Sequence, residues 1–214
     1  MHRPILAYIT LWFHWILAVV VLTFWKRATS PQRLVILVIL LIAGSSALEY
    51  YQANLGQNNL WITHFSTLFE FLLLSRVFYI WKKKEKQKKV IFVLAIVLVV
   101  VWILSKVTIE HFDRYDSYSA GIVRTLEIIY AISLFFDILN DAHTIPWNDA
   151  RVWIASGVII YSSGVILVFV VFNELLKISA PVLRSLWNIN WILLILSSSM
   201  YLRGIMCKEP KQNY

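Results

Sequence analysis

The segment from Leu60 to Lys89 limits what this chain can fold into more than any other stretch. It reads LWITHFSTLFEFLLLSRVFYIW and then KKKEKQKK, an apolar run long enough to cross a bilayer, followed by a block of lysines. Within this run lie His64, Glu70 and Arg76. At about 1.5 Å of rise per residue, Glu70 lies roughly 15 Å from the start of the segment, near the middle of the hydrocarbon. A charge there costs on the order of 3 kcal/mol, so we expect Glu70 to face other helices and to have a partner.

The composition extends this prediction to the whole chain. Of its 214 residues, 59% are hydrophobic and 15% are charged, and the mean hydropathy is +0.69. We predict one all-α domain over residues 1–214, because backbone polar groups in lipid must be satisfied within their own helix. A single cysteine, Cys207, excludes an intrachain disulfide and a cysteine-built metal cage. The net charge of +8 lies mostly in short loops, where it favours the lipid bilayer rather than nucleic acid as a partner.

The apolar runs predict a polytopic bundle of seven transmembrane helices joined by short loops, so that consecutive helices are antiparallel. The expected helices are Ile5–Trp25, Leu34–Tyr51, Leu60–Trp81, Val90–Val107, Ala120–Leu139, Val152–Glu174 and Leu183–Met206.

The distribution of lysine and arginine predicts the orientation of this bundle. One set of loops and the C-terminal end carry thirteen of them: Lys26, Arg27, Arg33, the six lysines between Lys82 and Lys89, Arg151, Arg203, Lys208 and Lys211. The other side carries five: Arg3, Lys106, Arg114, Lys177 and Arg184. The lysine-rich side is therefore predicted to be cytoplasmic, with the N-terminus outside and the C-terminus inside a bacterial inner (cytoplasmic) membrane.

Polar residues within the predicted spans gather toward the outer half of the bundle. They indicate a cavity open to the outside that binds a small molecule or ion. The candidate ligand-binding residues are Glu49, His64, Glu70, Arg124, Glu127, Tyr161 and Asn190. The competing interpretation is internal structure: Arg124 and Glu127 can pair at i, i+3, and His64 can bond Glu49 or an asparagine.

A catalytic or metal site is a further alternative, built from Glu70, Glu127 and a histidine at position 14 or 64. No HExxH spacing and no nucleophile motif supports it, so no catalytic residue and no cofactor is assigned.

Two smaller features have structural and functional interpretations. The loop Glu110–Asp116 is acidic and suits either a divalent ion or a solvated loop in which Asp116 or Ser119 caps the next helix. Nearer the cytoplasm, Arg76 and Asp137 lie at similar depths, and we expect them to form an ion pair.

Four pieces of the chain resemble a family of bacterial seven-helix integral membrane proteins with no assigned function. These pieces are NLWITHFSTLFEFLLL, TLEIIYAISLF, VWIASGVIIYSSG and LWNINWILLILSSSMY, and they cover about half of the chain. The resemblance implies that the family's glutamates correspond to Glu70 and Glu127 and its tyrosine to Tyr161. The family often has histidine where Asn190 stands, and asparagines where Leu194 and Ser198 stand, which places any histidine-dependent activity of that helix in doubt.

Members of that family are sometimes encoded near sensor kinases, which favours sensing. We therefore predict a receptor-like protein that signals through a separate cytoplasmic protein at the Lys82–Lys89 and Asn140–Arg151 loops. The alternatives are an intramembrane enzyme acting on a lipid-like substrate, a transporter, and a structural subunit of a membrane complex.

Overall fold

A computed structural model describes residues 4–113, 115–142, 146–175 and 180–207, with side chains except at 141–142, 167, 169–175 and 180–185. Within these residues the chain forms seven α-helices and no strand, which confirms the all-α prediction. The helices are α1 (Ile5–Thr23), α2 (Ser30–Asn54), α3 (Leu60–Trp81), α4 (Glu85–Thr108), α5 (Tyr118–Ala142), α6 (Ala150–Leu175) and α7 (Ala180–Met206).

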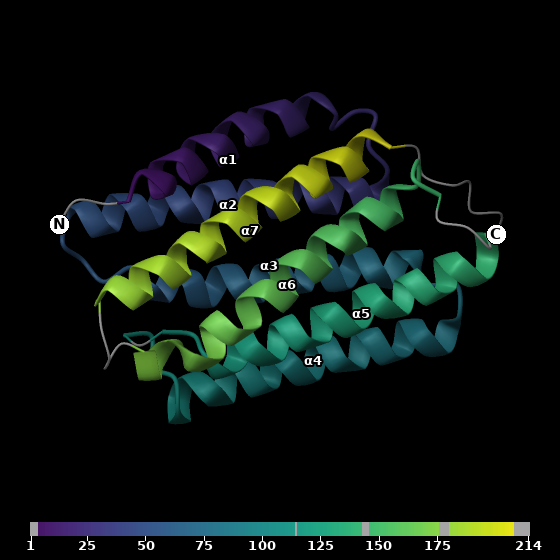
Figure 1. The fold of residues 1–214 in the computed structure, drawn as a ribbon. Helices are drawn as coiled ribbons and strands as arrows, with labels where there is room; N and C mark the ends of the chain where they lie inside the picture. The colour runs from purple at the N-terminus through teal and green to yellow at the C-terminus, as the bar shows by residue number, and fades with distance from the viewer. Residues whose placement is uncertain (1–3, 114, 143–145, 176–179, 208–214) are drawn as a thin grey trace.

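The helices lie side by side in one elongated bundle (Figure 1). Each helix packs against the next one in the chain, and α7 returns to pack against α1. Two further contacts cross the bundle, α3 with α5 and α2 with α7. Because the number of antiparallel helices is odd, α1 begins at one end of the bundle and α7 finishes at the other (Figure 1).

The outward faces of the bundle are apolar. Along α4, Phe92, Ile96, Val100 and Leu104 recur at intervals of four residues, and each is at least half exposed. α1 lies on the opposite side of the bundle from α4 (Figure 1). It exposes Trp12, Ile16 and Val19. A soluble protein does not present continuous apolar faces of this length to water. Such faces fit a hydrocarbon environment.

Four helices in the described part of the chain are long and apolar enough to cross a membrane: Ile5–Thr23, Ser30–Asn54, Glu85–Thr108 and Leu186–Met206. Ionisable residues also interrupt the apolar sequences of α3 and α5, which carry Glu70, Arg124 and Glu127. These three side chains are buried, so both helices hold these polar groups inside the bundle.

α6 and α7 approach each other closely at positions where α6 carries glycine. A Cβ atom on Gly157 would lie 2.8 Å from Tyr201 Cε1, and one on Gly164 would lie 2.5 Å from Leu193 Cδ1. The small residues of α6 therefore let α7 pack closely, as small residues do between membrane helices.

At the end of the bundle where α3 finishes, the predicted Arg76–Asp137 ion pair is wrong. Asp137 instead accepts a hydrogen bond from Lys82 Nζ at 2.7 Å, and Ser133 Oγ lies 2.7 Å from the same nitrogen. Arg76 is exposed, with its guanidinium 4.9 Å from the centre of the Tyr79 ring. Arg76 points outward because it lies on a different face of α3 from Glu70, which contacts α5. Lys82 follows the last turn of α3 and reaches inward.

The Lys82–Lys89 segment, which was expected to be a loop, is partly helical. α4 begins at Glu85 rather than at Val90, and Lys82 is buried. The charges on Lys83, Lys84, Lys86 and Lys89 remain exposed. Of the charges used to predict orientation, Arg3, Arg114, Lys177, the Arg184 side chain, Lys208 and Lys211 lie outside the described residues.

Candidate functional site

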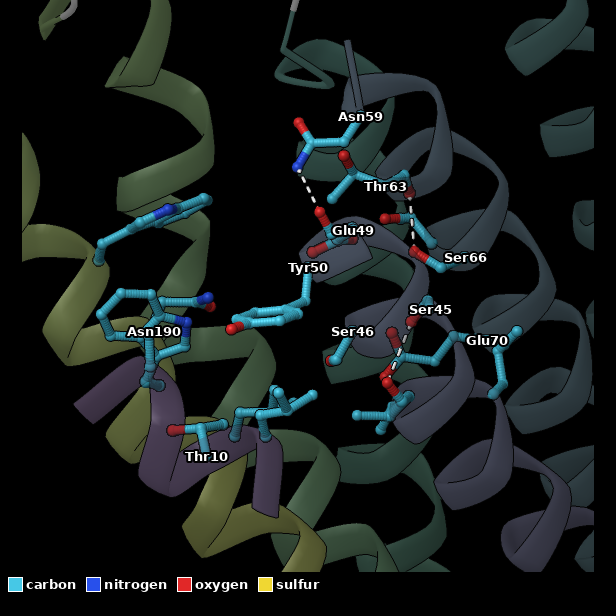
Figure 2. A pocket seen from close by; sticks show the side chains of 18 of the residues that line it. Thr10, Ser45, Ser46, Glu49, Tyr50, Asn59, Thr63, Ser66, Glu70 and Asn190 are labelled. Atoms are coloured by element: carbon cyan, nitrogen blue, oxygen red, sulfur yellow. Dashed lines mark hydrogen bonds between the residues drawn. The ribbon is translucent and has the colours of Figure 1, made fainter. Parts of the chain in front are cut away.

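A cavity of about 380 Å³ lies between α1, α2, α3 and α7 (Figure 2). Cavities of this size accommodate small organic molecules. Its lining reaches from Pro4, Ala53 and Asn59, at the ends of α1, α2 and α3, to Glu70 and Leu194. Glu70 is about three turns of helix from Asn59, so the cavity extends roughly 15 Å into the bundle from the end at which α1 begins.

One wall of the cavity is polar because two helices place regularly spaced polar residues on it. α2 contributes Ser45, Ser46 and Glu49, and α3 contributes Thr63, Ser66, Thr67 and Glu70. Spacings of three and four residues put these side chains on one face of each helix. Figure 2 shows Glu49 and Ser46 on this side, with Asn190 of α7 on the opposite side and Tyr50 between them.

The floor of the cavity is a buried network of charges centred on Arg124. Its Nη2 donates to Glu70 Oε2 at 2.8 Å, and its Nη1 donates to Glu127 Oε2 at 2.8 Å. Ser162 of α6 donates to the same Glu127 oxygen at 2.7 Å. The guanidinium also lies 4.6 Å from the centre of the Tyr161 ring. The expected i, i+3 pair and the expected partner for Glu70 are both confirmed.

The carboxylate of Glu49 has a different environment. It lines the cavity, and within the described part of the chain it has no hydrogen bond and no ion pair; the Asn59 amide donates to the Glu49 backbone carbonyl at 3.2 Å instead. Arg124 is the only cationic side chain among the described lining residues, and it already contacts two carboxylates. The cavity therefore holds more negative than positive charge when these groups are ionised.

Five of the seven predicted binding residues line this one cavity: Glu49, Glu70, Arg124, Tyr161 and Asn190. Glu127 lies behind Arg124, with 1% of its surface exposed, and does not line the cavity. His64 is fully buried elsewhere, with its Nδ1 3.6 Å from Asp116 Oδ1 and its ring against Phe112. The role of these residues in binding a ligand stays a prediction.

The histidines do not assemble the catalytic constellation considered as an alternative. His14 Nδ1 donates to the Thr10 carbonyl at 2.7 Å, and its Nε2 lies 3.0 Å from Ser198 Oγ. His64 belongs to the cluster around Asp116, and Arg124 occupies the space between Glu70 and Glu127. In the part of the chain that the structure describes, no group of three or more His, Cys, Asp or Glu side chains is arranged to hold a metal ion.

In the acidic loop before α5, Asp113 is exposed, but Glu110 and Asp116 are buried and contact a lysine. Lys106 Nζ lies 3.1 Å from Glu110 Oε2, 3.0 Å from Asp116 Oδ1 and 2.8 Å from Ser119 Oγ, and all four side chains are buried. The cation that the loop's carboxylates contact is thus Lys106 of α4. Glu110, rather than Asp116 or Ser119 alone, accepts the first backbone N–H groups of α5, from Tyr118 and Ser119.

The electrostatics of Glu110 follow from these contacts. Burial would raise the pKa of its carboxyl, but hydrogen bonds from Ser119 and Tyr118 and the charge of Lys106 outweigh that effect and lower the pKa below its ordinary 4.5. The ionised form of Glu110 therefore belongs to the folded loop, in which Tyr115 lines the cavity.

Below the floor of the cavity, the interior between α3 and α5 is mainly apolar, although it also contains the buried hydroxyl groups of Ser75 and Tyr130. Phe71, Leu74, Val77, Phe78 and Leu134 are almost completely buried there. These five side chains provide no polar groups that could form a path for a transported solute below the cavity floor.

Sequence reasoning missed several lining residues. The hydroxyl groups at 45, 46, 63, 66 and 67 could have been found from their helical spacing relative to Glu49 and Glu70. The aromatic residues Tyr50, Trp187 and Trp191 carry no such signal, because aromatic residues near helix ends are equally typical of the lipid interface.

No family model, curated protein or solved structure matches the chain. The resemblance to the family of seven-helix membrane proteins stays a prediction.

Proposed function

We propose that this chain is a receptor-like protein of the inner membrane that spans the bilayer seven times, with its N-terminus outside. A small ligand enters the cavity between α1, α2, α3 and α7 from outside, and a separate cytoplasmic protein receives the signal. The observation that carries the proposal is the cavity itself, which brings Glu49, Glu70, Arg124, Tyr161 and Asn190 from five helices to one half-enclosed space. A purely structural polar network would be expected to fill its own space.

The positions of charges support the proposed orientation. The exposed lysines at 83, 84, 86 and 89 lie at the end of the bundle opposite the cavity mouth. Under the positive-inside rule, the lysine end faces the cytoplasm and the cavity opens outward.

Ion pairs at both ends of the α3–α5 contact support coupling across the membrane. Glu70 of α3 bonds Arg124 of α5 beside the cavity, and Lys82 at the end of α3 bonds Asp137 of α5 at the lysine-rich end. The two ion pairs are about 18–20 Å apart along the helices. A ligand that shifts Glu70 and Arg124 would move α3 relative to α5, and Lys82–Asp137 would carry that movement to the Lys82–Lys89 segment.

The proposed orientation predicts a difference in labelling between two cysteine variants. In a Cys207→Ser background, Gln57→Cys should react with a membrane-impermeant maleimide added to intact spheroplasts, because this exposed residue would lie outside. Lys84→Cys should react only after the membrane is permeabilised, although Lys84 is also exposed. The reverse pattern would show that the lysine-rich end faces outward.

The proposed coupling predicts that filling the cavity changes the cytoplasmic end. Ser46→Trp places a large side chain in the cavity, and we expect hydrogen exchange of the Lys82–Lys89 backbone to change severalfold. The matched control is Gly44→Trp on the same helix, at an exposed position where an added Cβ atom meets nothing within 4 Å. Equal exchange in both variants and in the unmodified protein would contradict the receptor-like function.

A further inference from the structure

The charges around the cavity do not balance. Glu49, Glu70 and Glu127 lie in or behind its lining, and Arg124 is the only cation among the described lining residues. Two negative charges therefore remain when the carboxyls are ionised. Charge left uncompensated away from water is costly, so the cavity favours an occupant that supplies positive charge.

Glu49 is the group that such an occupant would meet. Arg124 holds Glu70 and Glu127 at 2.8 Å each, whereas the Glu49 carboxylate has no partner in the described part of the chain. Glu49 lies one turn from Ser45 and Ser46, whose side chains line the same wall (Figure 2). A donor N–H group on the ligand could bond this carboxylate and a neighbouring hydroxyl together.

The rest of the lining specifies an organic cation rather than a bare metal ion. Tyr50, Tyr115, Trp187 and Trp191 contribute aromatic rings, and Tyr115 packs edge-on against Trp187 with ring centres 5.4 Å apart. Ring faces attract ammonium groups, and the same rings contact apolar carbon. Leu11, Leu41, Ile42 and Leu194 add an aliphatic surface in a space of about 380 Å³.

From this combination we infer that the cavity binds a small organic ammonium compound, with its nitrogen against Glu49 and its apolar body against the aromatic and aliphatic wall. This inference rests on the proposed function and names the class of ligand. An anion is disfavoured, since Arg124 already contacts two carboxylates and the described lining offers no second cation.

The test compares three probes of nearly equal shape: phenethylammonium, neutral 2-phenylethanol and anionic phenylacetate. Binding to the full chain in lipid nanodiscs is measured by calorimetry at neutral pH. We expect phenethylammonium to bind at least about tenfold more tightly than 2-phenylethanol, and phenylacetate not to bind. Glu49→Gln should remove that tenfold advantage without unfolding the protein, since Glu49 has no partner to lose. Glu85→Gln, at a carboxylate that is 82% exposed, is the matched control and should bind as the unmodified protein does.

The outcomes separate the inference from the proposed function. Equal binding of the ammonium and the alcohol would overturn the inference, and so would full ammonium binding by Glu49→Gln. The absence of ammonium binding at about 10 mM would also overturn it, because that concentration is well above typical ligand dissociation constants. The proposed function would survive these results if Ser46→Trp still altered exchange at Lys82–Lys89. Undiminished ammonium binding by Ser46→Trp would place the ligand outside this cavity and overturn both.

Discussion

Replacing Arg124 with methionine is expected to lower the free energy of unfolding by about 3–5 kcal/mol, the cost of removing one partner from a buried ion pair. Arg124 is 2% exposed and compensates Glu70 and Glu127 at once. Its removal leaves two carboxylates in the interior with Ser162 as the remaining donor to Glu127. Methionine has a similar length and no charge, so the change tests electrostatics more than packing. The measurement is unfolding in mixed micelles with increasing dodecyl sulfate, followed by circular dichroism.

Two further variants show whether charge is the cause. Arg76→Met makes the same substitution on an exposed arginine of α3 and should cost less than about 1 kcal/mol. Adding Glu70→Gln and Glu127→Gln to Arg124→Met should restore most of the lost stability, since the uncompensated charges are then gone. If Arg124→Met were as stable as Arg76→Met, the network at the floor of the cavity would not stabilise the fold.

Replacing Lys106 with methionine should have an effect of similar size, about 3–5 kcal/mol, at the other buried cluster. Lys106 lies between Glu110 and Asp116, and Glu110 in turn holds the first N–H groups of α5. Without the lysine, we expect the loop before α5 to open, because its two carboxylates repel each other. Proteolysis and hydrogen exchange of residues 109–117 would report the opening. Lys89→Met, at an exposed lysine near the start of α4, is the matched control and should leave the loop protected.

The effect of Lys106→Met should depend on pH in a defined direction. The pKa of Glu110 is lowered in the folded protein, so its ionised form contributes stability that is complete above the ordinary value of 4.5. That contribution is lost as the pH falls below 4.5 through the folded pKa. The stability difference between the unmodified protein and Lys106→Met should therefore be largest at neutral pH and shrink below pH 4.5. A difference that grows on acidification would contradict the assigned role of Glu110.

The cavity and the charge network at its floor together explain why α3 and α5 carry ionisable residues within apolar segments. Arg124 joins α5 to α3 through Glu70, and Ser162 joins α6 to α5 through Glu127. Polar side chains that would be costly against lipid are instead paired within the bundle, where they also fix the depth of the cavity floor. Binding and stability would thus share residues at this site.

Features that depend on neighbouring positions within one helix could be read from the sequence. The helices were predictable because a backbone in hydrocarbon must satisfy its own hydrogen bonds, and α3 begins and ends at the expected residues. The Arg124–Glu127 pair was predictable because residues three apart share a helix face. The requirement for a partner at Glu70 followed from its depth alone.

Which residues meet across helices was decided only by the tertiary structure. Lys82, not Arg76, pairs with Asp137, since the rotation of α3 turns Arg76 outward and the end of the helix brings Lys82 inward. His64 was expected among the cavity residues, but it faces Asp116 in the loop before α5. The helical periodicity of the sequence determines on which face of its own helix a side chain lies. The rotation and register of one helix against another arise from packing along their whole length, such as the close contact at Gly157, and this packing decides partners far apart in the sequence.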